Sequence, residues 1–335
     1  MTESAPLSTR TSTGPALTVV SITPDSYETV RRTLRHVRAQ TALDEIELLL
    51  IAPSREALAA DESELAEFRW VKIVETGPFG PTGEVRARAV REASAPIVVF
   101  TEDHCFPEPE WAAALLARHA GPWAAVGPVL RNANPDTMVS WADLFIAYSP
   151  WLAPGSAGPR DHLPGHNSSY KVSVLLEYGD RLDQLMEAES VLQWDLRRRG
   201  HQLFLEPAAR AAHTNFAYWT TFRSIQVMNG RVFADTRCRD WSTAKRLAFA
   251  AASPLIPVVR FARAARDARR AGIPVSLMAR VAPTLAAGLL LDGVGQMLGY
   301  ALGADEALRV ALVDFESHRM ERNERSNPSR PAPRL

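Results

Sequence analysis

Short apolar runs alternate with helix-forming segments through the first hundred residues, and this alternation limits the possible folds more than any other feature. The run at 17–22 (LTVVSI) is rich in β-branched residues, and 27–40 repeats apolar residues at the spacing of one helix face. Further strands are predicted at 46–51, 71–74 and 97–100, and a further helix at 83–92. The order βαβαβ predicts an α/β domain with a largely parallel sheet.

Ligands of such sheets bind beyond the carboxyl ends of the strands, so the loops after residues 22, 51 and 100 should share one crevice. The loop after the fourth strand carries Glu102, Asp103 and His104 in succession. Carboxylate and imidazole groups can ligate Mg²⁺ or Mn²⁺, and such an ion could neutralise a diphosphate. A polar turn without a metal is the alternative interpretation.

The segment IVVFTEDHCFPEPEW resembles the strand, the D-x-D region and the following Pro-x-x-Trp of family 2 glycosyltransferases, which have the GT-A fold. In that family the first acidic position handles the ribose and the third handles the metal and the diphosphate. The resemblance places these positions on Glu102 and His104, with Asp103 between them as a donor-binding candidate. It implies a divalent cation, Mn or Mg, as cofactor. An imidazole at the third position ligates transition metals but is a poor ligand for Mg²⁺.

Two further segments resemble donor-binding parts of the family. The opening LTVVSITPDSYETV is similar to its first strand and nucleotide-contacting loop, which implies that Thr23, Pro24 and Asp25 contact the donor. A helix N-cap by Asp25 or Ser26 is an equally open interpretation and is compatible with binding. Arg86, in GEVRARAVREASA, matches an arginine that approaches the donor phosphates; an exposed, solvated arginine is the alternative.

The segment GHNSSYK resembles the family's Gly-x-Asn segment beside the acceptor, which implies that Asn167 contacts the acceptor. An amide can both donate and accept hydrogen bonds with a sugar, although an Asx-type turn would also use this residue. His213 matches a trailing histidine of the family and is a candidate metal or phosphate ligand. A packed, hydrogen-bonded histidine is the alternative there.

The segment EAESVLQWDLRRRG matches the family's catalytic helix in spacing and places the general base on Glu189. An inverting transfer needs such a base to take the proton of the acceptor hydroxyl as its oxygen attacks the anomeric carbon. Glu187, two residues earlier and on another face of the helix, is the alternative base.

The character of the sequence changes near residue 241 to Ala, Leu, Val, Pro and Arg. The apolar stretch 247–259 contains two prolines and is too short to span a bilayer, whereas 281–303 is long enough but contains Asp292 and Gln296. Five arginines lie between the stretches: Arg260, Arg263, Arg266, Arg269 and Arg270. This pattern predicts a basic, amphipathic helical hairpin at a membrane surface, with a soluble helical cap as the alternative.

Lys plus Arg and Asp plus Glu both number 38, so the net charge is zero and nothing global indicates nucleic acid as a partner. The two cysteines are too few for a disulfide framework and fit a reducing compartment. Because the first residues lack an apolar secretory run, we expect the protein at the cytoplasmic face of a membrane.

The predicted organisation is a disordered lead (1–15), a GT-A catalytic domain (16–240), a helical, membrane-associating region (241–320) and a disordered tail (321–335). The predicted function is inverting transfer of a sugar from a nucleotide-diphosphate sugar to a lipid-linked or polysaccharide acceptor. The alternative is an inactive GT-A domain that acts as a scaffold, because Ala52, His104 and Ala188 stand where the family has acids. A nucleotidyltransferase is disfavoured because no glycine-rich, lysine-containing loop follows the first strand.

Overall fold

The computed structural model describes residues 14–326. Its sheet begins with four parallel strands in the order β3-β2-β1-β4. These strands are β1 (Leu17–Ile22), β2 (Ile46–Ala52), β3 (Trp70–Glu75) and β4 (Ile97–Thr101). The helical segments that connect them are α1 (Tyr27–Arg38), η1 (Leu43–Glu45), α2 (Arg55–Leu58), α3 (Glu62–Leu65) and α4 (Thr82–Glu92). The predicted βαβαβ order and α/β class are confirmed.

Beyond β4 the sheet is mixed and continues in the order β8-β6-β9-β5, with β7 paired to β9. These strands are β5 (Cys105–Pro107), β6 (Ala125–Asn132), β7 (Gly158–Arg160), β8 (Ser169–Lys171) and β9 (Leu203–His213). β9 runs parallel to β6 and antiparallel to β5. The sheet of nine strands therefore joins a parallel block to a mixed block at β4.

Helices cover both faces of the parallel block, which explains its continuous apolar runs. Val20 of β1 belongs to one core cluster, while Val19 of the same strand belongs to the cluster on the other face. Helix α1 contributes Val30 and Leu34 to the second cluster, and α4 contributes Val90 to the first. The remaining helical segments of this half are α5 (Trp111–His119), α6 (Met138–Tyr148), η2 (Ser149–Trp151), α7 (Val172–Leu176), α8 (Arg181–Leu185) and α9 (Glu189–Arg198).

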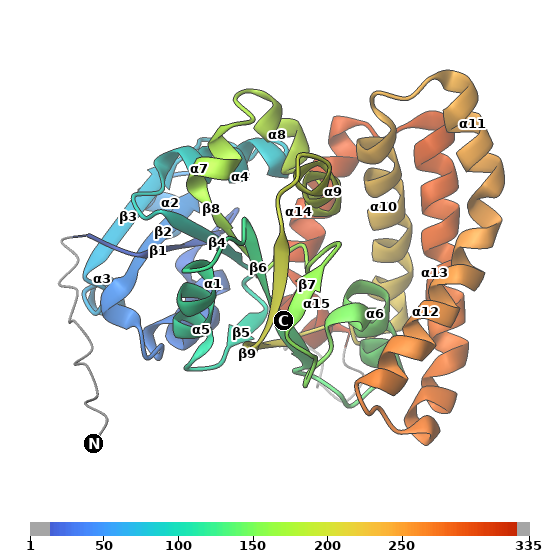
Figure 1. Ribbon diagram of the computed structural model, residues 1–335, viewed down its shortest axis with the longest axis horizontal. Helices are drawn as coiled ribbons and strands as arrows, with labels where there is room; N and C mark the ends of the chain where they lie inside the picture. Colours follow the sequence, from blue (N-terminus) through green and yellow to red (C-terminus); the bar gives the residue numbers. More distant parts are fainter. Residues whose placement is uncertain (1–13, 327–335) are drawn as a thin grey trace, which may run out of the picture.

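A group of long helices stands beside the sheet and forms a second half of the molecule (Figure 1). It consists of α10 (Trp219–Cys238), α11 (Thr243–Ala252), η3 (Ser253–Leu255), α12 (Ile256–Arg270) and α13 (Val275–Leu302). Helices α10 and α13 pack backbone against backbone. A Cβ atom at Gly230 would lie 2.3 Å from the carbonyl oxygen of Asp292, and one at Gly295 would lie 2.3 Å from that of Val227. Glycine is therefore required at both positions.

The stretch 247–259, which was predicted to be too short to span a bilayer, belongs to a longer helix. The chain is helical from Thr243 to Arg270, because η3 accommodates Pro254 and because Pro257 lies in the first turn of α12, where its missing N–H group costs no hydrogen bond. Two helical stretches, Thr243–Arg270 and Val275–Leu302, are thus long and apolar enough to cross a membrane by length and composition. A buried core helix meets the same criteria, so membrane association stays a prediction.

The chain then returns to the sheet half through α14 (Glu306–Ser317) and α15 (Arg319–Arg325). In this return segment, the His318 Nε2 atom lies 3.0 Å from Asp25 Oδ2. Because α15 extends to Arg325, residues 321–325 are helical, in contrast to the disordered tail predicted from residue 321. The other residues of the predicted tail, from 327, and most of the predicted lead, 1–13, lie outside the described residues.

Candidate active site

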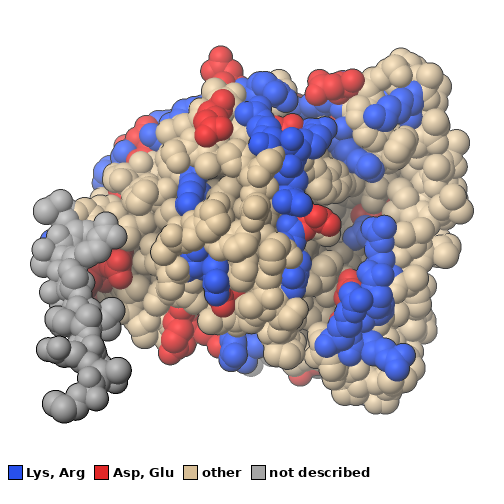
Figure 2. Space-filling model, viewed as in Figure 1, with Lys and Arg blue, Asp and Glu red and all other residues tan. Residues whose placement is uncertain are grey.

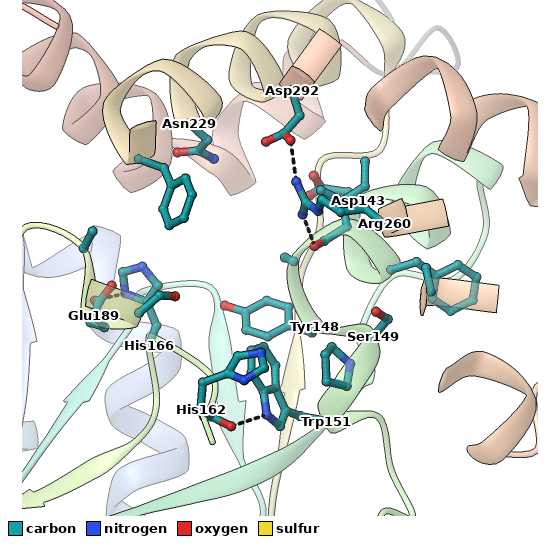
Figure 3. A pocket seen from close by; sticks show the side chains of 18 of the residues that line it. Asp143, Tyr148, Ser149, Trp151, His162, His166, Glu189, Asn229, Arg260 and Asp292 are labelled. Atoms are coloured by element: carbon teal, nitrogen blue, oxygen red, sulfur yellow. Dashed lines mark hydrogen bonds and ion pairs between the residues drawn. The ribbon is translucent and has the colours of Figure 1, made fainter. Parts of the chain in front are cut away.

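A cavity of about 1570 Å³ separates the sheet half from the helical half (Figure 3). Residues at the carboxyl ends of β1 and β4, Ile22 and Phe100, line it together with the start of α9. The opposite wall comes from α6, α12, α13 and α14. Of the three predicted loops, only the one after β4 lines the cavity, because β1 contributes its last residue alone and the residues that follow β2 contribute none.

Three potential metal ligands meet at the end of β4. The side chains of Glu102, His104 and His213 place one ligand atom each within 4.8 Å of one another. Glu102 Oε1 lies 3.6 Å from His104 Nε2, and Glu102 Oε2 lies 3.4 Å from His213 Nε2. Residues far apart in sequence meet because β5 pairs with β9 and sets Cys105 opposite His213. We call these three residues the cation triad.

Neighbouring groups orient both imidazoles of the cation triad. His104 Nδ1 lies 2.6 Å from Asp103 Oδ1, and His213 Nδ1 lies 2.9 Å from Asn215 Oδ1. Both Nε2 atoms therefore face Glu102, as in metal sites whose histidines are held by a second hydrogen bond. The buried His104 Nε2 has no hydrogen-bond partner within residues 14–326. A buried polar atom without a partner is unfavourable, and a bound cation would satisfy it, so the residues present fit a metal ion.

The protonation states of Glu102 and His104 also suit ligation. Burial acts against charge on Glu102, but the imidazoles of His166, His104 and His213 hold the pKa of its carboxyl well below the usual range. Burial, assisted by the charge of Arg319, lowers the pKa of His104 well below its usual value. An ionised carboxylate and a neutral imidazole are the forms that bind a cation.

Glu189 begins α9 and is buried in the cavity wall. Its Oε1 atom forms an ion pair with Arg86 Nη1 from α4, and Arg86 Nη2 lies 2.8 Å from His166 Nδ1. The same His166 Nδ1 atom lies 3.5 Å from Glu189 Oε1 and 3.4 Å from Glu102 Oε1. Figure 3 shows His166 beside Glu189, and its contact with Glu102 links the predicted base to the cation triad.

Arg86 and Glu187 differ from expectation in their surroundings. Arg86 is buried rather than solvated, and its partner is a carboxylate. Glu187, the alternative base, accepts hydrogen bonds from Arg309 Nη1 at 2.9 Å and from the Gly83 N–H at 3.3 Å. Because both oxygens of Glu187 have structural partners, Glu189 remains the better candidate for proton transfer.

Asn167 lies beside the cation triad rather than in open space. It has a positive φ of 66°, its N–H donates to the Phe100 carbonyl at 2.9 Å, and its Nδ2 donates to Glu102 Oε2 at 3.2 Å. This left-handed conformation is one that asparagine tolerates better than most residues. The predicted contact of Asn167 with an acceptor stays a prediction.

The donor-binding candidates of the first loop lie outside the cavity lining. Asp25 Oδ1 accepts a hydrogen bond from Thr23 Oγ1 at 2.9 Å, and its other oxygen pairs with His318. Ser26 is the N-cap residue of α1, but its side chain makes no cap hydrogen bond. Asp25 thus contacts the return segment, and the contact of Thr23, Pro24 and Asp25 with a donor stays a prediction.

Sequence reasoning missed Arg319 and His166. Arg319 is buried and lines the cavity, and its Nη1 atom lies 3.4 Å from His213 Nε2. Its Nε atom has no hydrogen-bond partner among the described residues. Arg319 comes from a helix far along the chain and His166 occupies a variable position of its motif, so neither carried a sequence signal.

Comparison with known proteins gives a fold but no family. No protein-family model matches the chain, and no curated protein sequence matches it. Among solved structures it is similar to the mannosyltransferase PcManGT from Pyrobaculum calidifontis in complex with GDP-Man and Mn²⁺, with 15% identity, a TM-score of 0.52, and coverage of 84% of this chain and 87% of that one. This likeness confirms the predicted GT-A fold with a helical C-terminal region.

Two other solved structures match more weakly. GalNAc-T7, with UDP, GalNAc and Mn²⁺, is 16% identical over 59% of this chain and 43% of its own, with a TM-score of 0.47. TarS from S. aureus is 15% identical over 85% of this chain and 55% of its own, with a TM-score of 0.40. The chain thus matches only about half of the length of each.

Proposed function

We propose that the protein is a metal-dependent glycosyltransferase that uses a nucleotide-diphosphate sugar. The observation that carries this proposal is the position of the cation triad and Glu189 in one cavity, joined by His166. A cation site at a strand end suits a diphosphate, and a buried carboxylate beside it suits a base. The similar mannosyltransferase, which shares the fold, holds GDP-Man and Mn²⁺.

The cation would be held by Glu102, His104 and His213, and when bound it supplies positive charge that stabilises the diphosphate as it leaves. Two imidazoles in the site favour Mn²⁺ over Mg²⁺. Arg319 lies beside the same site, with Nη1 3.4 Å from His213 Nε2, but its guanidinium already pairs with Glu316 and Asp143. We therefore assign the positive charge at the diphosphate to the cation.

Glu189 would act as the general base of an inverting transfer. Its carboxylate takes the proton of an acceptor hydroxyl while that oxygen forms a bond to the anomeric carbon and the bond to the diphosphate breaks. Arg86 fixes one oxygen of Glu189, which leaves the other for the acceptor. Gly165 allows close approach here, since a Cβ atom there would lie 3.0 Å from Glu189 Oε2.

The alternative of an inactive scaffold rested on missing acids at Ala52, His104 and Ala188. The oriented imidazoles of His104 and His213 argue against it, because a scaffold has no need for a buried His104 Nε2 without a partner. Enzymatic activity is therefore the better proposal.

We also propose that the helical half rests on an anionic membrane surface at the cytoplasmic face. Several large apolar side chains of this half are exposed: Leu255, Val258, Val259, Leu290, Val294, Met297 and Leu302. Figure 2 shows a stripe of basic side chains over α12 next to an uncharged surface. Arginines beside an apolar face suit anionic lipid, and each contributes roughly 1 kcal/mol near such a surface.

A donor panel tests the activity. The full chain is incubated with a membrane-lipid extract and each common nucleotide-diphosphate sugar, with Mn²⁺, with Mg²⁺ and with a chelator. We expect release of the nucleoside diphosphate from one donor, faster with Mn²⁺ than with Mg²⁺ and abolished by the chelator. Absence of release from every donor would reject the proposed activity, and release that is unaffected by the chelator would reject the role of the cation.

A further inference from the structure

The cavity extends from Glu189 along α12, and this end of it is strongly basic. Its lining includes Arg160, His162, Arg263, Arg266 and Arg270, and the carboxylate that faces these groups is Asp267. Arg260, one turn earlier on α12, is already neutralised by an ion pair with Asp292 (Figure 3). Three of these arginines belong to α12, whereas Arg160 ends β7 and His162 follows it, so the basic end draws on both halves.

The charges at the basic end are not balanced within the protein. Arg266 Nε lies 3.4 Å from Asp267 Oδ1, and Arg270 Nη1 lies 3.9 Å from the same oxygen, so two arginines share one carboxylate. Arg160 donates to the Pro159 and Ser156 carbonyls and to the Ser156 hydroxyl, which carry no charge. The side chain of Arg263, which lines the cavity from within α12, makes neither an ion pair nor a hydrogen bond with any described residue. Uncompensated guanidinium groups in a cavity wall are suited to an anion.

An apolar rim adjoins the basic end. Leu255 and Val259 line the cavity, yet 66% and 46% of their surfaces are exposed, so the cavity opens to the outside between apolar side chains. Val259 lies four residues before Arg263, which puts both on one face of α12. Exposed Val258 extends the apolar surface along the same helix. Apolar side chains, guanidinium groups and Glu189 thus line one cavity.

We propose that this end of the cavity binds the phosphate or diphosphate group of an amphiphilic acceptor. The apolar tail lies along Leu255 and Val259, the anion contacts Arg263 and Arg266, and the accepting hydroxyl points toward Glu189. The binding of tail and phosphate stands on the cavity alone, whereas the use of the hydroxyl rests on the proposed function. A lipid-linked phosphate satisfies all three contacts, whereas an uncharged soluble glycan satisfies neither the basic end nor the apolar rim.

Binding of simple probes to the full chain tests the subsite without any activity. The probes are dodecyl phosphate below its micelle-forming concentration, a neutral dodecyl amphiphile and inorganic diphosphate, each measured by calorimetry. The site variant is Arg263→Gln/Arg266→Gln. The matched control is Arg269→Gln/Arg280→Gln, which removes the same charge from exposed arginines that do not line the cavity.

Dodecyl phosphate should bind the wild type more tightly than either other probe. The site variant should weaken this binding roughly tenfold or more, as expected for the loss of charge-assisted hydrogen bonds, and the control should change it less than about twofold. Equal weakening in both variants would show general surface attraction and overturn the proposal. Equal binding of the neutral amphiphile would remove the role of the phosphate, and equal binding of inorganic diphosphate would remove that of the tail.

The donor panel separates this inference from the proposed activity. If no donor is turned over but dodecyl phosphate still distinguishes the two variants, the activity fails and the subsite stands. If a donor is turned over and both variants bind dodecyl phosphate like the wild type, the subsite fails and the activity stands.

Discussion

The two halves of the molecule differ in where their apolar side chains lie: they are buried in the cores of the sheet half but partly exposed on the surface of the helical half. In the sheet half, Glu102, Arg86 and Glu189 are gathered around the cavity floor, and the apolar residues fill two cores on the faces of the sheet. In the helical half, Leu255 and Val258 are among the most exposed large apolar side chains. The sheet half is thus built to bind polar ligands, and the helical half presents an apolar surface to its surroundings.

Asp292 shows that buried polar groups of the helical half have partners within the protein. Its carboxylate pairs with Arg260 and accepts a hydrogen bond from Gln296 at 2.8 Å. A polar residue in a long apolar helix therefore marks the face that packs inside the protein, against α12, and leaves the outer face of α13 apolar. In the sequence, Asp292 and Gln296 argue against a simple lipid-exposed span. In the structure, Asp292 pairs with Arg260 and Gln296 donates to Asp292.

We expect the largest effect, a loss of turnover, from a substitution in the sheet half. Glu189→Gln keeps the size of the side chain but removes the proton acceptor, so kcat should fall about a hundred- to ten-thousand-fold while donor binding persists. The measurement is nucleoside diphosphate release at saturating donor and acceptor.

Glu187→Gln is the matched control for the base. It should retain most of the turnover, because Glu187 is bonded to Arg309 and the Gly83 N–H rather than open to an acceptor. A greater loss in Glu187→Gln than in Glu189→Gln would reassign the base.

The next largest effect should appear at the apolar surface of the helical half. Leu255→Ser/Val258→Ser should weaken sedimentation with anionic vesicles by roughly tenfold or more, because each buried aliphatic side chain contributes about 1.5–3 kcal/mol. Leu176→Ser, at an exposed leucine of the sheet half, is the control and should change little. If the full chain ignores anionic vesicles at low salt, the helical half is a soluble cap and the contrast between the halves has another cause.

A smaller effect concerns the packing of α10 on α13. Gly295→Ala should lower the free energy of unfolding by about 1–3 kcal/mol, because the added methyl group meets backbone atoms that cannot yield easily. Gly80→Ala, where the nearest atom is a flexible Glu84 oxygen at 3.6 Å, is the control in the sheet half. Equal denaturant midpoints for the two variants would contradict the described packing.

The smallest effect should come from the contact between the return segment and the first loop. Burial opposes charge on His318, but the Asp314 carbonyl and Asp25 raise its pKa. A raised folded-state pKa means that this contribution to stability is complete below the unfolded value of about 6.5 and is lost as the pH rises through the folded value.

His318→Gln should therefore destabilise the protein at about pH 5.5 by a few tenths of a kcal/mol and have no effect at about pH 9. Denaturant unfolding of both proteins at the two pH values checks this. A difference that grows with pH would show that the sign is wrong.

The sequence was informative where local pattern and burial agree. The runs at 17–22 and 46–51 became β1 and β2 because both faces of these strands are covered, which leaves an uninterrupted apolar signature. The order of motifs also predicted Glu102, His104 and His213 as parts of one site.

Long-range contacts could not be predicted from the sequence. Arg319 reaches His213 because α14 and α15 fold back from the helical half, and nothing local to residue 319 records this. Similarly, Pro254 and Pro257 suggested a break, since the ability of η3 and of the first turn of α12 to accommodate them depends on their neighbours. Such features arise from tertiary packing, which a single sequence does not display.

The central claim is that the cation triad binds a divalent metal beside Glu189, and direct Mn²⁺ binding tests it most plainly. The full chain is titrated with Mn²⁺ while electron paramagnetic resonance reports the free ion, in comparison with His213→Gln and with a control, His201→Gln, at a histidine outside the cavity. We predict binding to the wild type and the control, and binding weakened at least about tenfold in His213→Gln, since loss of even a supporting group of a metal site typically costs about 10–100-fold. Equal affinity in all three proteins, or no binding to the wild type, would contradict the account.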